Sequence, residues 1–311
     1  MLVNSAIRKL YNSFAVLLCL TASYLAHAGN GASPALYLAQ KGDTKIYLLG
    51  SIHAGREDFY PLASHIQQAF QDADELLLEL TPDQMTPQQL QAAMMKFGVL
   101  SSPKPLQDRM TSATYDQIKT VIADAGLPAH QLIFMRDWAI LIQLTVATIQ
   151  KMGLAADQGV DQHFSTLAAS AGKPMRGLET LEQQFEILAS MDELGPELLY
   201  KDFVNELSYA KNWLQAVESA WRNGDAARLN SLYQEYDERQ QQADFMSKLN
   251  RDRNKNWRDQ LVLLPTGKTY MMVVGDMHIH ANDSVLDFLK ESDFEVKQIH
   301  HVVAAQQTAA L

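Results

Sequence analysis

Two stretches of sequence decide the fold: KIYLLGSIH at residues 45–53 and TYMMVVGDMH at residues 269–278. In each, an apolar run of strand length, rich in β-branched and aromatic residues or methionine, leads directly into a Gly-x-x-His turn. Glycine allows the backbone to turn sharply or to approach another group closely, here at Gly50 and at Gly275. Each stretch therefore predicts a β-strand that ends in a tight turn.

A histidine follows each glycine by three residues, at His53 and at His278. In open α/β sheets, ligands bind at the carboxyl ends of the strands, which is where both histidines fall. Imidazole is the commonest metal ligand in proteins and the usual general base near neutral pH. The pair predicts one shared site, whereas either histidine alone could equally be a structural one.

The segments around these stretches predict an α/β fold with a central mixed sheet flanked by helices. The first turn is preceded by a hairpin strand at residues 35–39 and followed by an amphipathic helix at 61–73 and a strand at 75–80. The second turn is followed by a helix at 284–290 and a strand at 294–299. Strand, Gly-x-x-His turn, helix and strand thus occur twice, as two related half-sites. Residues between about 82 and 264 read as a helical insertion, with one short strand at 173–178.

Glu79 is the third candidate for the site. It falls in the apolar run at residues 76–80, where a carboxylate is costly unless it is paired with a charge or bound to a cation. The alternative is that Glu79 lies on the exposed side of a half-buried strand.

Five further residues are candidates for supporting roles. Asp161 and Glu179 fall at element boundaries, where Asp161 could cap a helix and Glu179 could end a strand at the same edge of the sheet. Arg253 and Asn254 occupy an amphipathic helix, where they could orient a carboxylate, bind substrate or form a solvated face. His280 follows His278 by two residues, so a local turn would decide whether it also supports the site.

The N-terminus is typical of a secretory signal peptide. Arg8 and Lys9 precede an apolar stretch at residues 14–20, and small residues at Ala26 and Ala28 form a cleavage site. We expect residues 1–28 to be removed and residues 29–311 to form one exported domain, periplasmic or secreted. An uncleaved N-terminal anchor is the alternative.

Composition limits the partners. The chain has a net charge of −10, which is a poor surface for nucleic acid or anionic lipid. Its single cysteine, Cys19, lies in the segment expected to be removed, so the mature chain would have no thiolate ligand. No later stretch is apolar enough to span a bilayer, so we expect a soluble mature protein without stable membrane insertion. The oligomeric state stays open.

Several familiar catalytic motifs are missing from the sequence. It has no His-Glu-x-x-His, no Gly-x-Ser-x-Gly, no phosphate-binding Walker loop and no Gly-x-Gly-x-x-Gly. A site of histidines and a carboxylate would suit Zn, Mn, Fe or Co, and the sequence does not choose among them.

A family resemblance joins these observations. The segments KIYLLGSIHAGREDFYPL, ADELLLEL, GVDQHF, GKPMRGLETLEQQF, RDRNKNW and TYMMVVGDMHIHANDSVLDFL, in this order, closely resemble the TraB/PrgY/GumN family, which includes the TIKI proteins. The resemblance implies an α/β fold related to erythromycin-esterase-like and ChaN-like proteins. It also implies a site made of His53, Glu79 and His278. The TIKI members are metal-dependent peptidases, and manganese or cobalt is the implicated ion.

Three functions follow as hypotheses. The preferred one is a periplasmic metal-dependent hydrolase, a peptidase acting on a peptide or protein. In it, His53 and His278 bind or position the ion, and Glu79 is a further ligand or the base that takes a proton from the bound water. Arg253 and Asn254 contact the substrate or the developing oxyanion. The second is a binding protein for a peptide or a haem-like ligand. The third is a metal-free, esterase-like hydrolase that uses His53 or His278 as its general base.

Overall fold

The computed structural model describes residues 31–239 and 243–299. The expected signal peptide at residues 1–28 lies outside the described residues. Within them, no helix is both long and apolar enough to cross a membrane.

The described residues contain one six-stranded mixed sheet with the strand order β4-β3-β5-β2-β1-β6. Strands β2, β3, β4 and β5 pair in parallel, and β1 pairs antiparallel with β2 on one side and with β6 on the other. The strands are β1 (Leu36–Lys41), β2 (Thr44–Ser51), β3 (Glu75–Leu78), β4 (Met175–Gly177), β5 (Thr269–Gly275) and β6 (Glu295–Ile299).

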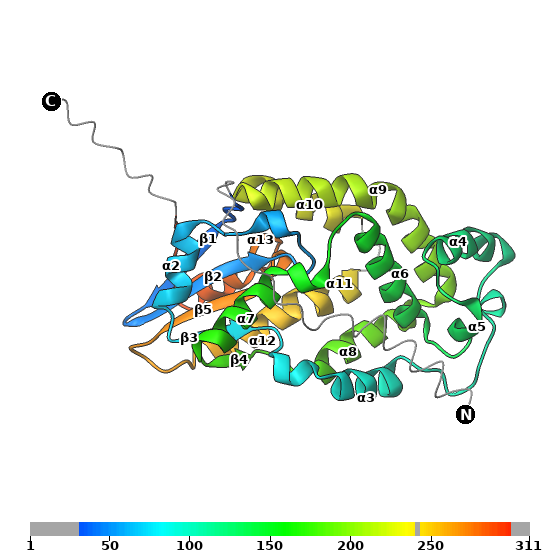
Figure 1. Ribbon diagram of the computed structural model, residues 1–311, viewed down its shortest axis with the longest axis horizontal. Helices are drawn as coiled ribbons and strands as arrows, with labels where there is room; N and C mark the ends of the chain where they lie inside the picture. Colours follow the sequence, from blue (N-terminus) through cyan, green and yellow to red (C-terminus); the bar gives the residue numbers. More distant parts are fainter. Residues whose placement is uncertain (1–30, 240–242, 300–311) are drawn as a thin grey trace.

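Helices surround the sheet and form a second body beside it (Figure 1). The α-helices are α2 (Ser64–Asp72), α3 (Pro87–Phe97), α4 (Ser112–Asp124), α5 (Ala129–Leu132), α6 (Asp137–Lys151), α7 (Val160–Ala171), α8 (Leu181–Ala189), α9 (Pro196–Arg222), α10 (Ala226–Arg239), α11 (Ala243–Leu249), α12 (Arg251–Leu261), α13 (Met277–His280) and α14 (Val285–Glu291). Short 3-10 helices lie at Glu57–Phe59, Pro82–Met85, Leu106–Asp108, Ala156–Gln158 and Ser190–Leu194.

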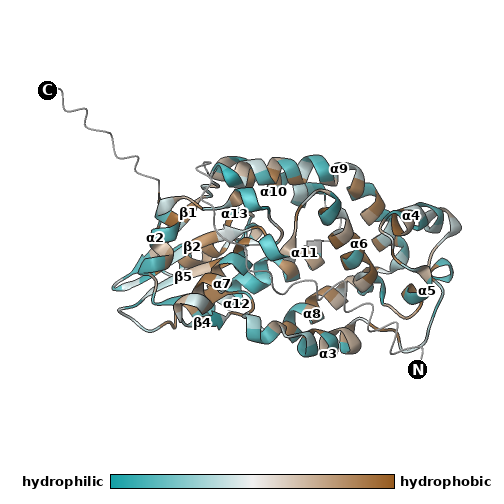
Figure 2. Ribbon diagram, in the orientation of Figure 1, coloured by the Kyte–Doolittle hydropathy of each residue, from teal (hydrophilic) through white to brown (hydrophobic). Residues whose placement is uncertain are grey.

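The two central strands alternate their side chains between two cores. On β5, Met271 and Val273 enter the core that α2, α7, α9 and α10 cover, whereas Tyr270, Met272 and Val274 enter the core that α12 and α14 cover. This is the period of two that a strand buried on both faces requires. Figure 2 shows apolar segments on these strands and also on the helices, and α9 alternates between apolar and polar along its length.

The connections from the two central strands run in opposite directions. From β2 the chain passes through α2 to β3, beyond β5, and from β5 it passes through α14 to β6, beyond β2 and β1. Because crossovers between parallel strands are right-handed, opposite directions place α2 and α14 on opposite faces of the sheet. The chain connections therefore reverse direction between β2 and β5. In sheets of this kind, ligands bind at the carboxyl ends of the strands at this point of reversal.

A third apolar cluster packs α3, α4, α6, α8 and part of α9 together at the end of the molecule away from the sheet (Figure 1). Helix α9 joins the two bodies, because Leu199 and Tyr200 belong to this cluster and Val217 and Trp221 belong to the core over the sheet. The predicted α/β class, with a mixed sheet flanked by helices, is confirmed.

Candidate functional site

The two Gly-x-x-His turns lie side by side. They follow neighbouring parallel strands in which Gly50 pairs with Val274 and Ser51 pairs with Gly275. The N–H of Asp276 also donates to the carbonyl of Ser51 at 2.9 Å, which extends the pairing into the second turn. The sheet register therefore fixes one turn against the other.

Three of the predicted site residues meet at Gly275. A Cβ atom placed on this glycine would lie 2.9 Å from Nε2 of His53, 3.3 Å from Oε1 of Glu79 and 3.6 Å from Cδ2 of His278. The side chains thus converge from two turns and from the end of β3. Gly275 has no side chain to fill the space they share, and its N–H donates to Oε1 of Glu79 at 2.8 Å.

His53 is the exposed member of the cluster. Its side chain is 59% exposed, with Nδ1 donating to Oδ1 of Asp161 at 3.2 Å and Nε2 lying 3.7 Å from Oε1 of Glu79. The protein around the ring lowers its pKa by removing water, but the two carboxylates outweigh this and raise the pKa of His53 to about 9.

Asp161 reaches His53 because the start of α7 packs against the first turn. The N–H of Val160 donates to the carbonyl of Ile52 at 3.0 Å, and a Cβ on Gly159 would lie 2.5 Å from the carbonyl oxygen of His53. Gly159 is the N-cap residue of α7, and no side chain makes a capping hydrogen bond there. The helix-cap role expected as an alternative for Asp161 is therefore wrong, and its carboxylate pairs with His53 instead.

Glu79 lies one residue beyond β3 rather than within it, so the alternative of an exposed position on a half-buried strand does not apply. Its carboxylate is 13% exposed. Oε2 accepts hydrogen bonds from Arg253 at 2.6 Å and from Gln184 at 3.1 Å. Burial alone would raise the pKa of Glu79, but Arg253, His53, His278 and the Gly275 N–H hold it well below its usual range. Glu79 is therefore a buried, fully ionised carboxylate.

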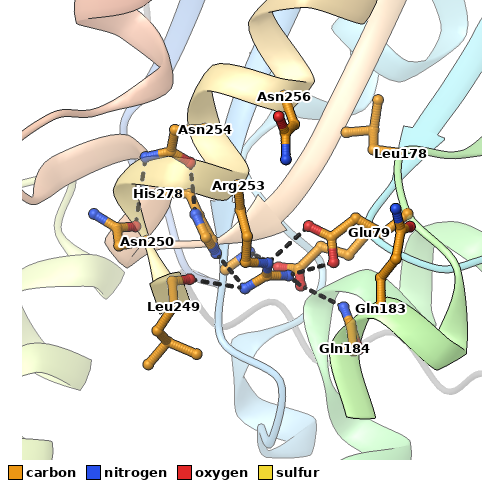
Figure 3. A network of polar contacts seen from close by, with 12 residues as sticks. Glu79, Leu178, Gln183, Gln184, Leu249, Asn250, Arg253, Asn254, Asn256 and His278 are labelled. Carbon is orange, nitrogen blue, oxygen red and sulfur yellow. Dashed lines mark hydrogen bonds and ion pairs between the residues drawn. The ribbon is translucent and has the colours of Figure 1, made fainter. Parts of the chain in front are cut away.

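Arg253, at the N-terminal end of α12, is the hub of the buried part of the site (Figure 3). Its Nε and Nη2 donate to both oxygens of Glu179 at 2.7 and 3.1 Å, and Nη2 also donates to Glu79. Its Nη1 donates to Nε2 of His278 at 2.9 Å and to the carbonyl of Leu249 at 3.2 Å. Arginine has five N–H donors, so none is left for an oxyanion or a substrate in this arrangement.

His278 is held in a single neutral form. Arginine can only donate, so Nε2 of His278 must accept, and Nδ1 must carry the proton that it donates to Oδ1 of Asn254 at 2.6 Å. The amide of Asn254 is oriented by its own donation to the carbonyl of Asp283 at 2.8 Å. Burial first, together with the positive charge of Arg253, lowers the pKa of His278 to about 3. Asn254 therefore fixes the tautomer of His278 and, being fully buried, does not face a substrate.

His280 belongs to a separate buried network behind the site. Its Nδ1 lies 2.9 Å from Oδ1 of Asp276, its Nε2 lies 3.1 Å from the hydroxyl of Tyr37, and the hydroxyl of Tyr233 donates to Oδ2 of Asp276 at 2.9 Å. This network holds the second turn in place against β1 and α10. A Cβ on Gly50 would lie 2.0 Å from Oδ1 of Asp276, so the first glycine allows the second turn to approach.

The donor set does not fit a metal ion in this arrangement. Both ring nitrogens of His278 are engaged by protein groups, and the guanidinium of Arg253 occupies the space next to Glu79 and His278 (Figure 3). A second cation there would meet the fixed positive charge of Arg253. Within residues 31–239 and 243–299, no group of three or more His, Cys, Asp or Glu side chains is arranged to hold a metal ion.

Sequence reasoning missed Gln184 and Asp276. Gln184 lies on α8, which begins next to Glu179 at the capping box of Thr180 and Gln183, and nothing in its local pattern marks it out. Asp276 did carry a signal, because it stands inside the second Gly-x-x-His turn, where a buried carboxylate needs partners.

Comparison with known proteins agrees with this architecture. The sequence profile of the TraB/PrgY/gumN family matches residues 35–298. The chain is 26% identical over 262 residues to "Uncharacterized protein YbaP" of Escherichia coli (strain K12), covering 83% of this chain and 92% of that protein, and it is equally similar to YbaP of Shigella flexneri. No solved structure matches. The family profile covers both turns and every residue of the site, and on this ground the chain belongs to the TraB/PrgY/gumN family.

Proposed function

We propose that the chain is a hydrolase in which His53 acts as the general base on a water molecule, without a bound metal. The observation that carries this proposal is the placement of His53. It is the one histidine of the cluster with an exposed side chain, it is oriented by a carboxylate on Nδ1, and it presents Nε2 beside a second carboxylate. A histidine oriented in this way is the usual arrangement for proton transfer in acyl hydrolysis.

Proton transfer would run through His53, with Asp161 and Glu79 supporting its ring. Asp161 accepts the Nδ1–H and so leaves Nε2 free to take a proton. The water loses that proton to Nε2 as its oxygen attacks the acyl carbon, and the imidazolium then returns the proton to the leaving amine or alkoxide. Glu79, held ionised by Arg253, stabilises the imidazolium from the other side. Peptide bonds are the proposed substrate class because the family includes peptidases, and esters are the alternative.

We also propose that this activity belongs outside the cytoplasm. The support is the signal-peptide pattern of residues 1–28, including its basic start and its Ala26 and Ala28 cleavage site. N-terminal sequencing of the protein recovered from a periplasmic fraction tests this. We expect the mature chain to begin at Gly29, and an intact N-terminus in the cytoplasmic fraction would contradict it.

Turnover by purified residues 29–311 tests the proposed hydrolase. The protein is assayed without a His tag against a peptide library and a series of chromogenic esters, with and without a strong chelator. We expect hydrolysis that survives the chelator and falls by at least about a hundredfold in His53→Ala, the usual scale for loss of a general base. His130→Ala is the matched control, because His130 is exposed on α5 in the helical body, and it should keep full activity.

Two outcomes would count against the proposal. Equal turnover by His53→Ala and the wild type would remove His53 from the reaction. Tight binding of a peptide, or a haem absorption band that depends on His53, with no turnover of any substrate, would favour a binding protein.

A further inference from the structure

We infer that the guanidinium of Arg253 is the resident cation of this site, occupying the place that a divalent metal ion would take in a site of histidine and carboxylates. The inference deepens the proposed metal-free hydrolase, but it concerns which cation the buried groups hold. Its test therefore does not depend on turnover.

The side-chain acceptors that face Arg253 resemble a metal ligand set, and one further N–H donates to the carbonyl of Leu249. They are Oε2 of Glu79 at 2.6 Å, the two oxygens of Glu179 at 2.7 and 3.1 Å, and Nε2 of His278 at 2.9 Å. One imidazole and two carboxylates are a common donor set for Mn, Fe and Co. Here the lone pairs of these groups point at N–H bonds of an arginine, at hydrogen-bond distances rather than ligand distances.

The groups behind the acceptors also follow the plan of a metal site. A histidine that ligates a metal usually donates its other ring N–H to a protein oxygen, which fixes its tautomer. Asn254 does this for His278 at 2.6 Å, so that Nε2 faces Arg253. Gln184 donates to Glu79 in the same supporting role. The surroundings thus orient acceptor atoms of three side chains toward one positive centre, and that centre is the guanidinium.

Arg253 is a buried residue of the core. It is 8% exposed, it is carried on a helix whose buried side includes Trp257 and Leu261, and its guanidinium lies 4.9 Å from the ring of Trp257. If Arg253 moved out, Glu179, which is also 8% exposed, would lose both of its charged hydrogen bonds. A divalent ion would therefore have to displace an intramolecular cation whose partners are already satisfied.

Metal titration of the tag-free wild type is the first half of the test. The protein is dialysed against Mn²⁺ or Co²⁺, its metal content is measured by mass spectrometry, and its melting temperature is followed with and without a chelator. We expect no stoichiometric metal and no change in melting temperature. One equivalent of Mn²⁺ or Co²⁺ bound by the wild type and lost in His278→Asn would overturn the inference.

Replacement of the cation is the second half. In Arg253→Ala the buried acceptors lose their positive partner, so methylguanidinium or Co²⁺ in the millimolar range should raise the melting temperature of this variant. Arg176→Ala is the matched control, because Arg176 makes the same bidentate ion pair with Glu75 at the exposed edge of the sheet. Neither cation should stabilise the Arg176→Ala variant. Folded Arg253→Ala protein that responds to neither cation would overturn the inference.

Arg253→Lys covers the case in which the alanine variant does not fold. Lysine keeps one positive charge among the same acceptors, so we expect this variant to fold and to bind no metal. Stoichiometric Mn²⁺ or Co²⁺ in folded Arg253→Lys would contradict the inference, because it would show that a resident positive charge does not exclude the ion.

Discussion

Nε2 of His53 lies 3.7 Å from Oε1 of Glu79, and different elements hold the two groups apart. His53 is tied through Nδ1 to Asp161 on α7, whereas Glu79 is tied to Gly275, Gln184 and Arg253. The separation exceeds a direct hydrogen bond and suits an ion pair or a contact through a shared water. His53 can therefore gain or lose a proton while Glu79 and Arg253 keep their positions.

The pH dependence of hydrolysis should follow His53. The carboxylates of Asp161 and Glu79 overcome the effect of burial and raise its pKa to about 9, and only the neutral ring can accept a proton. We expect kcat/KM to increase with pH, to reach half of its maximum near pH 9 and to level off above it. Asp161→Asn removes the nearer carboxylate, so the pKa should fall toward its ordinary value of about 6.5 and the rise should move to lower pH. The readout is a pH–rate profile of both proteins.

Titration of the ring by NMR checks the same shift without any substrate. The His53 resonance, assigned by its absence from His53→Ala, should titrate at higher pH in the wild type than in Asp161→Asn. Asp157→Asn, a change in the short helix just before α7, serves as the control and should leave the titration unchanged. Identical His53 titrations in the wild type and Asp161→Asn would contradict the assigned pairing.

The buried His278 should make folding sensitive to mild acid. Its pKa is lowered to about 3 in the fold, below the ordinary 6.5, so the unfolded chain binds this proton more readily. The stabilisation that comes from keeping His278 neutral is therefore fully present above pH 6.5, and it is lost as the pH falls toward 3. Glu79 adds to this loss only below its ordinary pKa of 4.5, and burial raises the pKa of Glu179, so the contribution of His278 is taken from the difference between the wild type and a His278 variant between pH 4.5 and 6.5.

Urea denaturation across that range measures the effect of His278. His278→Asn keeps a donor toward Asn254 but cannot be protonated, so the free energy of unfolding should lose about 1.4 kcal/mol less per pH unit than in the wild type. His163, whose pKa burial lowers to about 4, is present in both proteins and cancels. Parallel slopes for the wild type and His278→Asn would show that His278 is not held neutral.

The Arg253–Glu179 pair, whose arginine lies on α12, and the Arg176–Glu75 pair at the sheet edge should differ in their contribution to stability. Loss of Arg253 leaves two buried carboxylates without a cation, which should cost about 3–5 kcal/mol. Arg176, 44% exposed, pairs with Glu75 in the same two-pronged way, and Arg176→Ala should cost about 1 kcal/mol or less. Urea denaturation at pH 7 compares them, and similar losses for the two variants would refute the assigned burial of the Arg253 cluster.

The sequence was sufficient to predict the parts of the site that belong to strands. Apolar runs that end in Gly-x-x-His place His53 and His278 at strand ends, and the sheet order then makes those ends neighbours. Glu79 was expected inside a strand and lies just beyond one, yet the reason for choosing it holds, since a carboxylate in an apolar run requires a charged partner.

What the sequence did not provide was the partner of each group. Asp161 meets His53 because the α7 N-terminus packs on the first turn, a tertiary contact with no local signature. Arg253 was expected to orient a carboxylate, to contact a substrate or to form a solvated face; the first holds, but a helical period places Arg253 on one side of α12 without saying which acceptors lie opposite. Its five donors are instead used by Glu79, Glu179, His278 and a carbonyl.

The two motif glycines should separate folding from activity. In Gly50→Ala the added methyl group would lie 2.9 Å from Cα of Asp276 as well as 2.0 Å from its carboxylate. Backbone must then move, and we expect a loss of about 1–3 kcal/mol. In Gly275→Ala the nearest atoms are the ends of side chains, Nε2 of His53 at 2.9 Å and Oε1 of Glu79 at 3.3 Å, so these side chains can shift without the backbone movement that Gly50→Ala requires. Gly275→Ala should therefore unfold near the wild-type urea concentration but lose most of its hydrolytic activity, because its methyl group fills the space between His53 and Glu79. Activity retained in Gly275→Ala would place the reacting water away from that space, whereas wild-type stability in Gly50→Ala would show that the two turns are not in close contact.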